Sequence, residues 1–199
     1  MSGALDDIVV LDVTRGFASS MTAAFLGDFG ARVIRLEPLG GASHRGVVDE
    51  DGARSGTWNH EADLIHRNKQ SLALDVATAR GRAVLDDLLA RCDVVLTDWP
   101  LAELAALGLD YAAACARRPD IVVARLSGFG PKGKDRELPA IDELAAARTG
   151  MMPIVQQPGE PPVYTGAGAM HAAVLLAFGV VTALLHRQHS GEGQQVDTS

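Results

Sequence analysis

The chain has 199 residues, of which 47% are hydrophobic and 22% charged, a composition that excludes a disordered protein and fits one folded domain over residues 1–199. Its formal net charge is −7, and acidic and basic residues are mixed along the sequence without a basic run. Nucleic acid is therefore excluded as a partner, whereas a phosphorylated ligand is not, because a few arginines and helix N-termini can bind phosphate.

Cysteine content and hydropathy indicate a cytoplasmic protein that does not enter the membrane. Cys92 and Cys115 are the only cysteines, too few for a disulfide framework, and no metal site is expected. Met1–Asp7 lacks the basic start and apolar core of a signal peptide. One apolar stretch, Ala169–Leu185, has 17 residues and carries His171, so it is shorter than the ~20 apolar residues that a bilayer requires. It is predicted to be a buried helix of a soluble core.

The N-terminal elements follow a strand, helix, strand pattern. The short apolar run Ile8–Leu11 is typical of a strand that is buried on both faces. Ser19 or Ser20 can cap the helix that follows, and Gly30 ends it. Arg32–Leu36 then predicts a second strand, and the three elements form one βαβ unit whose strands pair in parallel.

The rest of the chain continues this alternation after a long loop. Residues from Pro38 to Gly56 are rich in Gly, Ser and charge and lack periodicity, which predicts a loop of a length that is often functional. Further strands are expected at Leu72–Asp75, Val94–Thr97 and Ile121–Leu126. Further helices are expected at Thr78–Ala90, in a stretch that ends at Leu107, at Ile141–Ala147 and from about Met170. The alternation predicts an α/β fold with a parallel sheet covered on both faces and a long buried helix at its end.

Several motifs occur in one order over nearly the whole chain. They are the stretches Leu5–Arg15, Leu26–Pro38, Arg67–Asp75, Ser127–Gly130 and Ser190–Asp197. In this order and spacing they resemble the family III CoA-transferases, the group that contains formyl-CoA and carnitine CoA-transferases and the α-methylacyl-CoA racemases. The resemblance implies a Rossmann-like parallel sheet flanked by helices, with the large domain incomplete and the family's small domain absent.

The resemblance also implies where an acyl-CoA would bind. The CoA backbone would lie over the first loop, with further contacts from the loops at 74–77 and 98–100. The implied CoA-binding residues are Arg15, Gly16, Phe17, Ala18, Leu74, Asp75, Asp98 and Trp99. CoA or acyl-CoA is then a substrate, and no tightly bound cofactor is expected. The chain departs from the family pattern at residues 18–20 and at Pro38, and the residues alone favour ordinary packing at strand ends.

The catalytic residues of the family are missing from their expected positions. In the transferases an aspartate that follows a glycine, just before the long helix, attacks the thioester, and the corresponding pair here is Gly168-Ala169. The racemases use a His and an Asp as paired bases, and the His position is held by Ile141. Two weak candidates remain: Asp142, with a helix-capping or structural role as the alternative, and His171, with a satisfied histidine at the start of a core helix as the alternative.

Two functional hypotheses follow from these residues. The first is a CoA-transferase subunit that acts on an acyl-CoA and a carboxylic acid within a homo- or hetero-oligomer, where a related chain with an intact Gly-Asp pair supplies the carboxylate. The alternative, which Ala169 favours, is a catalytically degenerate CoA-binding or structural partner.

Glu37 at the end of the second strand suggests an NAD-dependent dehydrogenase, but the turn after the first strand has only Gly16 where that fold requires Gly-x-Gly-x-x-Gly.

Overall fold

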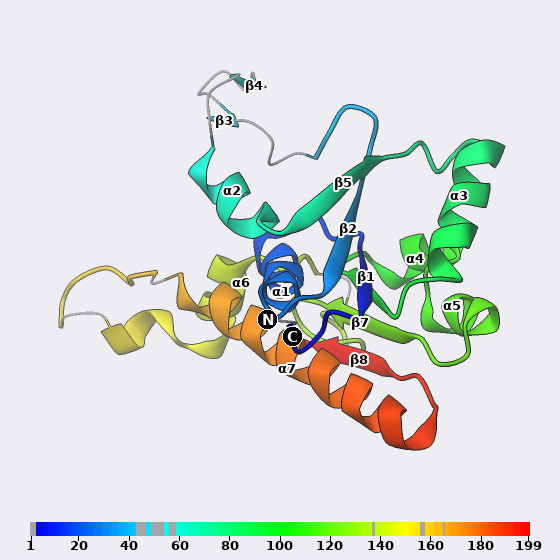
Figure 1. The fold of residues 1–199 in the computed structure, drawn as a ribbon. Helices are drawn as coiled ribbons and strands as arrows, with labels where there is room; N and C mark the ends of the chain where they lie inside the picture. The colour runs from blue at the N-terminus through cyan, green and yellow to red at the C-terminus, as the bar shows by residue number, and fades with distance from the viewer. Residues whose placement is uncertain are drawn as a thin grey trace.

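A sheet of six parallel strands, in the order β5-β2-β1-β6-β7-β8, carries helices on both faces (Figure 1). The computed structural model describes residues 3–42, 47–48, 54–55, 59–136, 138–155, 158–164 and 166–199. The strands of this sheet are β1 (Val9–Asp12), β2 (Arg32–Glu37), β5 (Lys69–Ala73), β6 (Val94–Thr97), β7 (Val122–Leu126) and β8 (Gln195–Thr198). The helices are α1 (Phe17–Asp28), α2 (His60–His66), α3 (Ala79–Leu89), α4 (Leu101–Leu107), α5 (Tyr111–Arg117), α6 (Asp142–Thr149) and α7 (Ala167–Ser190), and a 3₁₀ turn covers Met152–Val155.

The α/β fold predicted from the alternation of strands and helices is confirmed. Strands β1, β6 and β7 are short runs of mostly Val and Leu whose residues are almost all buried. A parallel sheet that is covered on both faces requires such continuous apolar runs. Because β1 lies between β2 and β6, the order of the strands reverses direction at the β1–β6 boundary.

Each face of the sheet has its own apolar core. On one face α1 and α7 pack against each other and enclose a cluster that includes Met21, Leu26 and Leu176. On the other face α3, α4 and α5 enclose a second cluster that includes Leu85 and Leu104. Figure 1 shows these two groups of helices on opposite sides of the strands. Burial of each large aliphatic side chain contributes ~1.5–3 kcal/mol, so both layers stabilise the sheet.

Helix α7 covers the sheet with one face and leaves the other face exposed. Leu176, Val180 and Leu184 are buried, whereas Phe178 is 70% exposed. Within the described residues α7 alone is long and apolar enough, by length and composition, to cross a membrane. Its buried face belongs to the core, as predicted for this segment, but its outer face is apolar as well.

The ends of several elements differ from the sequence prediction. Helix α1 begins at Phe17, and Gly16 holds the N-cap position that Ser19 or Ser20 was expected to fill. Ser19 instead donates a hydrogen bond to Asp98, and the hydroxyl of Ser20 lies 2.8 Å from that of Thr14. Strand β5 begins at Lys69, three residues before the predicted start. It is an edge strand whose first residues are polar, so it extends beyond the apolar run that predicted it.

Some short elements have no clear sequence pattern. Helices α2 and α5 and strand β8 each mix polar and apolar residues, so no period predicts them. The loop predicted after Pro38 contains the antiparallel pair β3 (Val47–Val48) and β4 (Arg54–Ser55). The rest of the segment between 43 and 58 lies outside the described residues.

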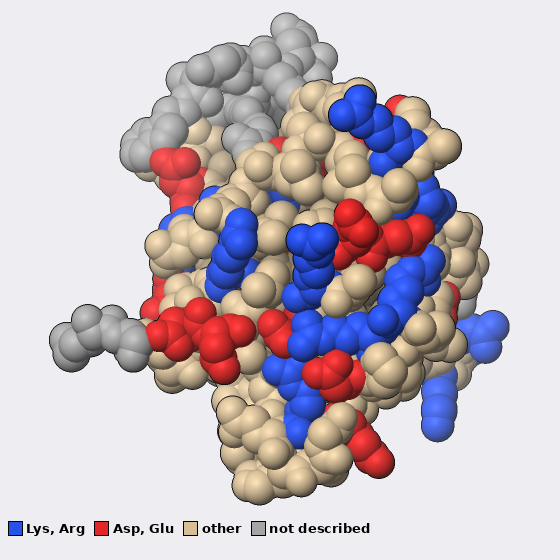
Figure 2. Space-filling model, turned by 45° about the vertical axis from the view of Figure 1, so that its right-hand side comes forward, with Lys and Arg blue, Asp and Glu red and all other residues tan. Residues whose placement is uncertain are grey.

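Charged side chains of both signs alternate on the surface shown in Figure 2. Arg117 lies 2.7 Å from Asp86, and Asp93 accepts from both Arg118 and Arg187 at 2.6 and 3.0 Å. These pairs join α3 to α5 and the end of α7 to the sheet. On this face acidic side chains lie beside the cations.

Candidate functional site

The candidate site lies at the carboxyl ends of β1 and β6, where the strand order changes direction. In open α/β sheets ligands bind in the crevice at this point, because the loops that follow the two strands diverge. β1 ends at Asp12 and β6 at Thr97, and the loops that follow carry Arg15 and Asp98–Pro100. Two cavities adjoin along this edge of the sheet.

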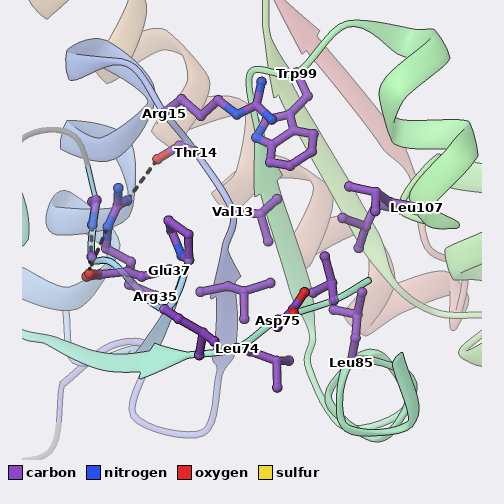
Figure 3. A pocket seen from close by; sticks show the side chains of 17 residues that line it. Val13, Thr14, Arg15, Arg35, Glu37, Leu74, Asp75, Leu85, Trp99 and Leu107 are labelled. Atoms are coloured by element: carbon purple, nitrogen blue, oxygen red, sulfur yellow. Dashed lines mark hydrogen bonds and ion pairs between the residues drawn. The ribbon is translucent and has the colours of Figure 1, made fainter. Parts of the chain in front are cut away.

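The first cavity has a volume of about 610 Å³ and a mainly apolar lining. Figure 3 shows Val13, Leu74, Leu85 and Leu107 around one space, with Trp99 at its upper end. Such a lining suits a flat, apolar or heteroaromatic group, and the volume lies in the range of small-molecule sites.

The second cavity has a volume of about 730 Å³ and is more polar. It is formed by the loop after β1, the loop after β7, the segment 138–143 and the start of α7. Arg15 and Trp99 line both cavities, so the two spaces meet at this pair of residues.

Arg15 is stacked on Trp99 at the junction of the cavities. Its guanidinium carbon lies 3.4 Å from the ring centroid, and Figure 3 shows the side chain extended over the indole. Its Nη1 also donates to Oε2 of Glu103 at 3.1 Å. The side chains of Arg15 and Glu103 are 54% and 48% exposed, so their ion pair contributes little to stability. Arg15 can therefore turn toward a ligand at a small cost in free energy.

Asp98 caps the first turn of α1 from the neighbouring loop. Its carboxylate accepts hydrogen bonds from the backbone N–H groups of Arg15 (3.0 Å) and Gly16 (2.6 Å) and from the hydroxyl of Ser19 (2.5 Å). These are donors that a helix N-terminus would otherwise offer to a phosphate. A phosphate could use these amides only by displacing Asp98, so the cationic side chain of Arg15 is the more accessible phosphate ligand.

A buried charge cluster lies behind the first cavity. Oδ2 of Asp12 is 2.7 Å from Nζ of Lys69 and 3.2 Å from Nη1 of Arg35, and Glu37 lies 3.6 Å from Nε of Arg35. Burial opposes ionisation of Asp12, but the two cations outweigh it and hold the pKa of Asp12 below its ordinary value. Burial lowers the pKa of Lys69, and the nearby Asp12 carboxylate opposes this shift only in part. Glu37 also accepts from the N–H of Ala42 at 3.1 Å, so the cluster fixes the loop that lines the cavity.

The start of α6 and the start of α7 meet in the second cavity. Asp142 and Ala169 both line it, and Oδ2 of Asp142 accepts a hydrogen bond from the Tyr164 hydroxyl at 2.8 Å. A β-carbon at Gly168 would overlap Oδ1 of Asp142, so only glycine admits this carboxylate to the first turn of α7. Partial removal from water and the Asp142 carboxylate raise the pKa of Tyr164 to about 12, so the hydroxyl remains a donor at neutral pH.

Gly128 lets the chain before α6 approach the end of β7. A β-carbon at Gly128 would lie 2.7 Å from the carbonyl oxygen of Pro139. The glycine of the Ser-Gly-Phe-Gly motif therefore has a packing role, which brings the segment that carries Asp142 over the sheet edge.

Arg125 is a buried cation at the end of β7 and lines the second cavity. Its side chain is 5% exposed, and its Nε donates to Oδ1 of Asp197 on β8 at 3.2 Å. Within the described residues its Nη2 has no hydrogen-bond partner, and the same holds for Nε1 of Trp99. A buried donor without a partner costs ~1–3 kcal/mol, so a polar ligand that satisfied either one would gain affinity.

The predicted CoA-binding residues are brought together. Arg15, Leu74, Asp75 and Trp99 line the first cavity, and Arg15, Gly16, Phe17, Ala18, Asp98 and Trp99 line the second. His171 lines neither cavity: it is exposed on α7, and its Nδ1 lies 2.6 Å from the carbonyl oxygen of Ala167. In the part of the chain that the structure describes, no group of three or more His, Cys, Asp or Glu side chains could hold a metal ion.

Arg125 and Tyr164 are site residues that the sequence reasoning does not identify. For Arg125 a signal exists, because it is a charged residue inside the otherwise apolar run Val122–Leu126. For Tyr164 no local pattern distinguishes it from an ordinary loop residue.

Comparisons with known proteins show the family of the chain. The family model described as CoA-transferase family III matches residues 5–199. The chain is 32% identical over 196 residues to cinnamoyl-CoA:phenyllactate CoA-transferase of Clostridium sporogenes, an alignment that covers 96% of this chain and 48% of that protein. It is 34% identical over 207 residues to succinyl-CoA:mesaconate CoA-transferase of Haloarcula hispanica, covering 99% and 52%.

A solved structure shares the fold. The CAIB/BAIF family protein from Brucella suis matches with a TM-score of 0.91 and 27% identity, over 100% of this chain and 53% of that one. The chain thus spans about half the length of the relatives that it matches. With a match over residues 5–199, a shared fold and two cavities at the expected edge of the sheet, the chain belongs to CoA-transferase family III.

Proposed function

We propose that the chain forms the acyl-CoA-binding part of an enzyme that transfers CoA between an acyl-CoA and a carboxylic acid. Family membership supports this chemistry, since two relatives that are named as CoA-transferases are 32% and 34% identical to the chain. The observation that carries the proposal is the pair of cavities, one apolar and one polar, that meet at Arg15 and Trp99.

An acyl-CoA has the same division along its length. It carries a flat adenine at one end, phosphates in the middle and a reactive thioester at the other end. In this proposal the adenine occupies the first cavity beside Leu74 and Trp99, and the phosphates pass Arg15. The thioester then reaches the second cavity, where Ala169 and Asp142 lie.

Arg125 is proposed to bind the acid that exchanges with the acyl group. It is a buried cation with an unsatisfied Nη2 within the described structure, and it lines the cavity that would hold the thioester. A guanidinium pairs well with a carboxylate because its planar donors match the two oxygens.

Ala169 is the feature that favours the alternative function. It stands in the first turn of α7, where the family resemblance puts the attacking aspartate, and a methyl group cannot form an acyl anhydride. A catalytically degenerate CoA-binding or structural partner is therefore the second candidate. The two differ in whether this polypeptide reacts covalently with the acyl group.

We also propose a cytoplasmic oligomer formed with a second, related CoA-transferase chain. The outer face of α7 supports a partner, because Val174, Leu175 and Phe178 are 53%, 58% and 70% exposed. Cys92 and Cys115 are both free, which fits a reducing compartment.

Calorimetric titration of the protein with CoA tests the proposed binding mode. Replacement of Trp99 by Ala removes the wall that both cavities share, and we expect CoA binding to weaken by about 10-fold or more, since that factor corresponds to ~1.4 kcal/mol of lost contact. Phe29→Ala, at an aromatic residue that is 55% exposed, is the matched control and is expected to bind as the wild type does. No binding of CoA to the wild type would contradict the proposal, and so would equal affinities of the three proteins.

A further inference from the structure

We infer that Asp142 supplies the carboxylate that accepts the acyl group, in place of the side chain that Ala169 lacks. The inference rests on the proposed function and names the reacting group of the same site. It follows from where the fold places this acid, which lies 27 positions before Ala169 in the sequence but beside it in space.

Helices α6 and α7 are in contact where Asp142 lies. The carboxylate of Asp142 lies against the backbone of Gly168, so closely that any side chain at 168 would overlap its Oδ1. Gly168 is the residue before Ala169, and Ala169 and Asp142 line the same cavity of about 730 Å³. An acid on α6 therefore fills space next to the position from which the first turn of α7 would present an aspartate.

The Asp142 carboxylate is positioned by a hydrogen bond and by the start of α6. Tyr164 donates to its Oδ2 at 2.8 Å, which fixes the side chain while leaving lone pairs for attack. Asp142 also lies in the first turn of α6, where the helix dipole favours an anion. Neither contact is an ion pair that would neutralise the carboxylate, in contrast to the buried Asp12.

The reaction at Asp142 uses only the acyl-CoA and the acceptor carboxylic acid. An Asp142 oxygen attacks the thioester carbonyl, the C–S bond breaks, and an acyl-aspartyl anhydride and the CoA thiolate form. The thiolate then attacks the aspartyl carbonyl, which releases the first carboxylate and leaves an Asp142–CoA thioester. The acceptor carboxylate attacks the aspartyl thioester, which forms a second anhydride and releases the CoA thiolate. The thiolate then attacks the acceptor's carbonyl carbon in this anhydride. The products are the new acyl-CoA and free Asp142, so atoms and charge balance.

Trapping of the aspartyl thioester tests the inference directly. The full chain is incubated with acetyl-CoA, treated with borohydride, which reduces an aspartyl thioester to homoserine, and digested for tandem mass spectrometry. We expect the modification at Asp142 in the wild type and its complete loss in Asp142→Asn. CoA exchange between acetyl-CoA and a labelled carboxylate should fall with it, on the order of 10³-fold or more.

Asp87→Asn is the matched control, because it makes the same change of carboxylate to amide at an exposed residue of α3 that lines neither cavity. We expect the modification at Asp142 to persist in this variant. Modification of another carboxylate, whether on this chain or on a co-purified partner, would overturn the inference, and so would no modification in a wild type that binds CoA in the calorimeter. Loss of CoA binding itself would instead refute the proposed function, so the two failures are distinguishable.

Discussion

Asp12 is buried with two cations, and its ionisation therefore couples stability to pH. Lys69 and Arg35 hold its pKa below the ordinary value despite burial. A carboxyl group with a depressed pKa contributes its full stabilisation above its unfolded pKa and loses it as the pH falls through the folded value. The free energy of unfolding should therefore lose this contribution only below the ordinary Asp pKa of 3.8.

Replacement of Asp12 by Asn leaves Lys69 and Arg35 without their shared anion. We expect the free energy of unfolding at pH 7 to fall by about 3–5 kcal/mol, and the gap from the wild type to narrow as the pH falls below ordinary carboxyl values. Urea unfolding from pH 2.5 to 7 measures both effects. Asp86→Asn, which removes a partly exposed pair with Arg117, should cost at most about 1 kcal/mol, and a similar cost at Asp12 would refute the role assigned to the cluster.

At the scale of elements, the contact between α6 and α7 places Asp142. Replacement of Gly168 by Ala adds a β-carbon where the Asp142 carboxylate lies. We expect thermal stability to change little, because alanine suits a helix better than glycine, whereas borohydride trapping at Asp142 should be lost. CoA affinity should remain within a few-fold of the wild type. Trapping that survives this substitution would show that the close contact is not needed for the reaction.

The sheet could be predicted from sequence further than the site. Strand β6 is found with its observed bounds, Val94–Thr97, because a run of apolar residues between polar ones has few alternatives. The parallel topology also brings the loops after β1, β5 and β6 to one edge, where the residues lie that the family resemblance implies for CoA binding. The contacts within the site were not, since Asp98 binds the amide of Arg15 across 83 residues and no local period encodes such a pair.

For the whole molecule, the exposed apolar face of α7 predicts association with a second chain. Replacement of both Leu175 and Phe178 by Asp should convert an oligomer into a monomer in size-exclusion chromatography with light scattering, while the circular dichroism spectrum is unchanged. These side chains are 58% and 70% exposed, so their replacement should not disturb the core. A wild type that is monomeric at micromolar concentration would refute the prediction, and binding of the wild type to lipid vesicles would assign this face to a membrane instead.

The division of the site into an apolar and a polar cavity is the claim on which the function depends. The most direct test is a crystal structure of the protein with acetyl-CoA bound. We expect the adenine in the cavity beside Leu74 and Trp99, and the thioester carbon within van der Waals contact of the Asp142 carboxylate in the cavity that Ala169 lines. An acetyl-CoA bound elsewhere, or with its thioester away from the start of α7, would contradict it.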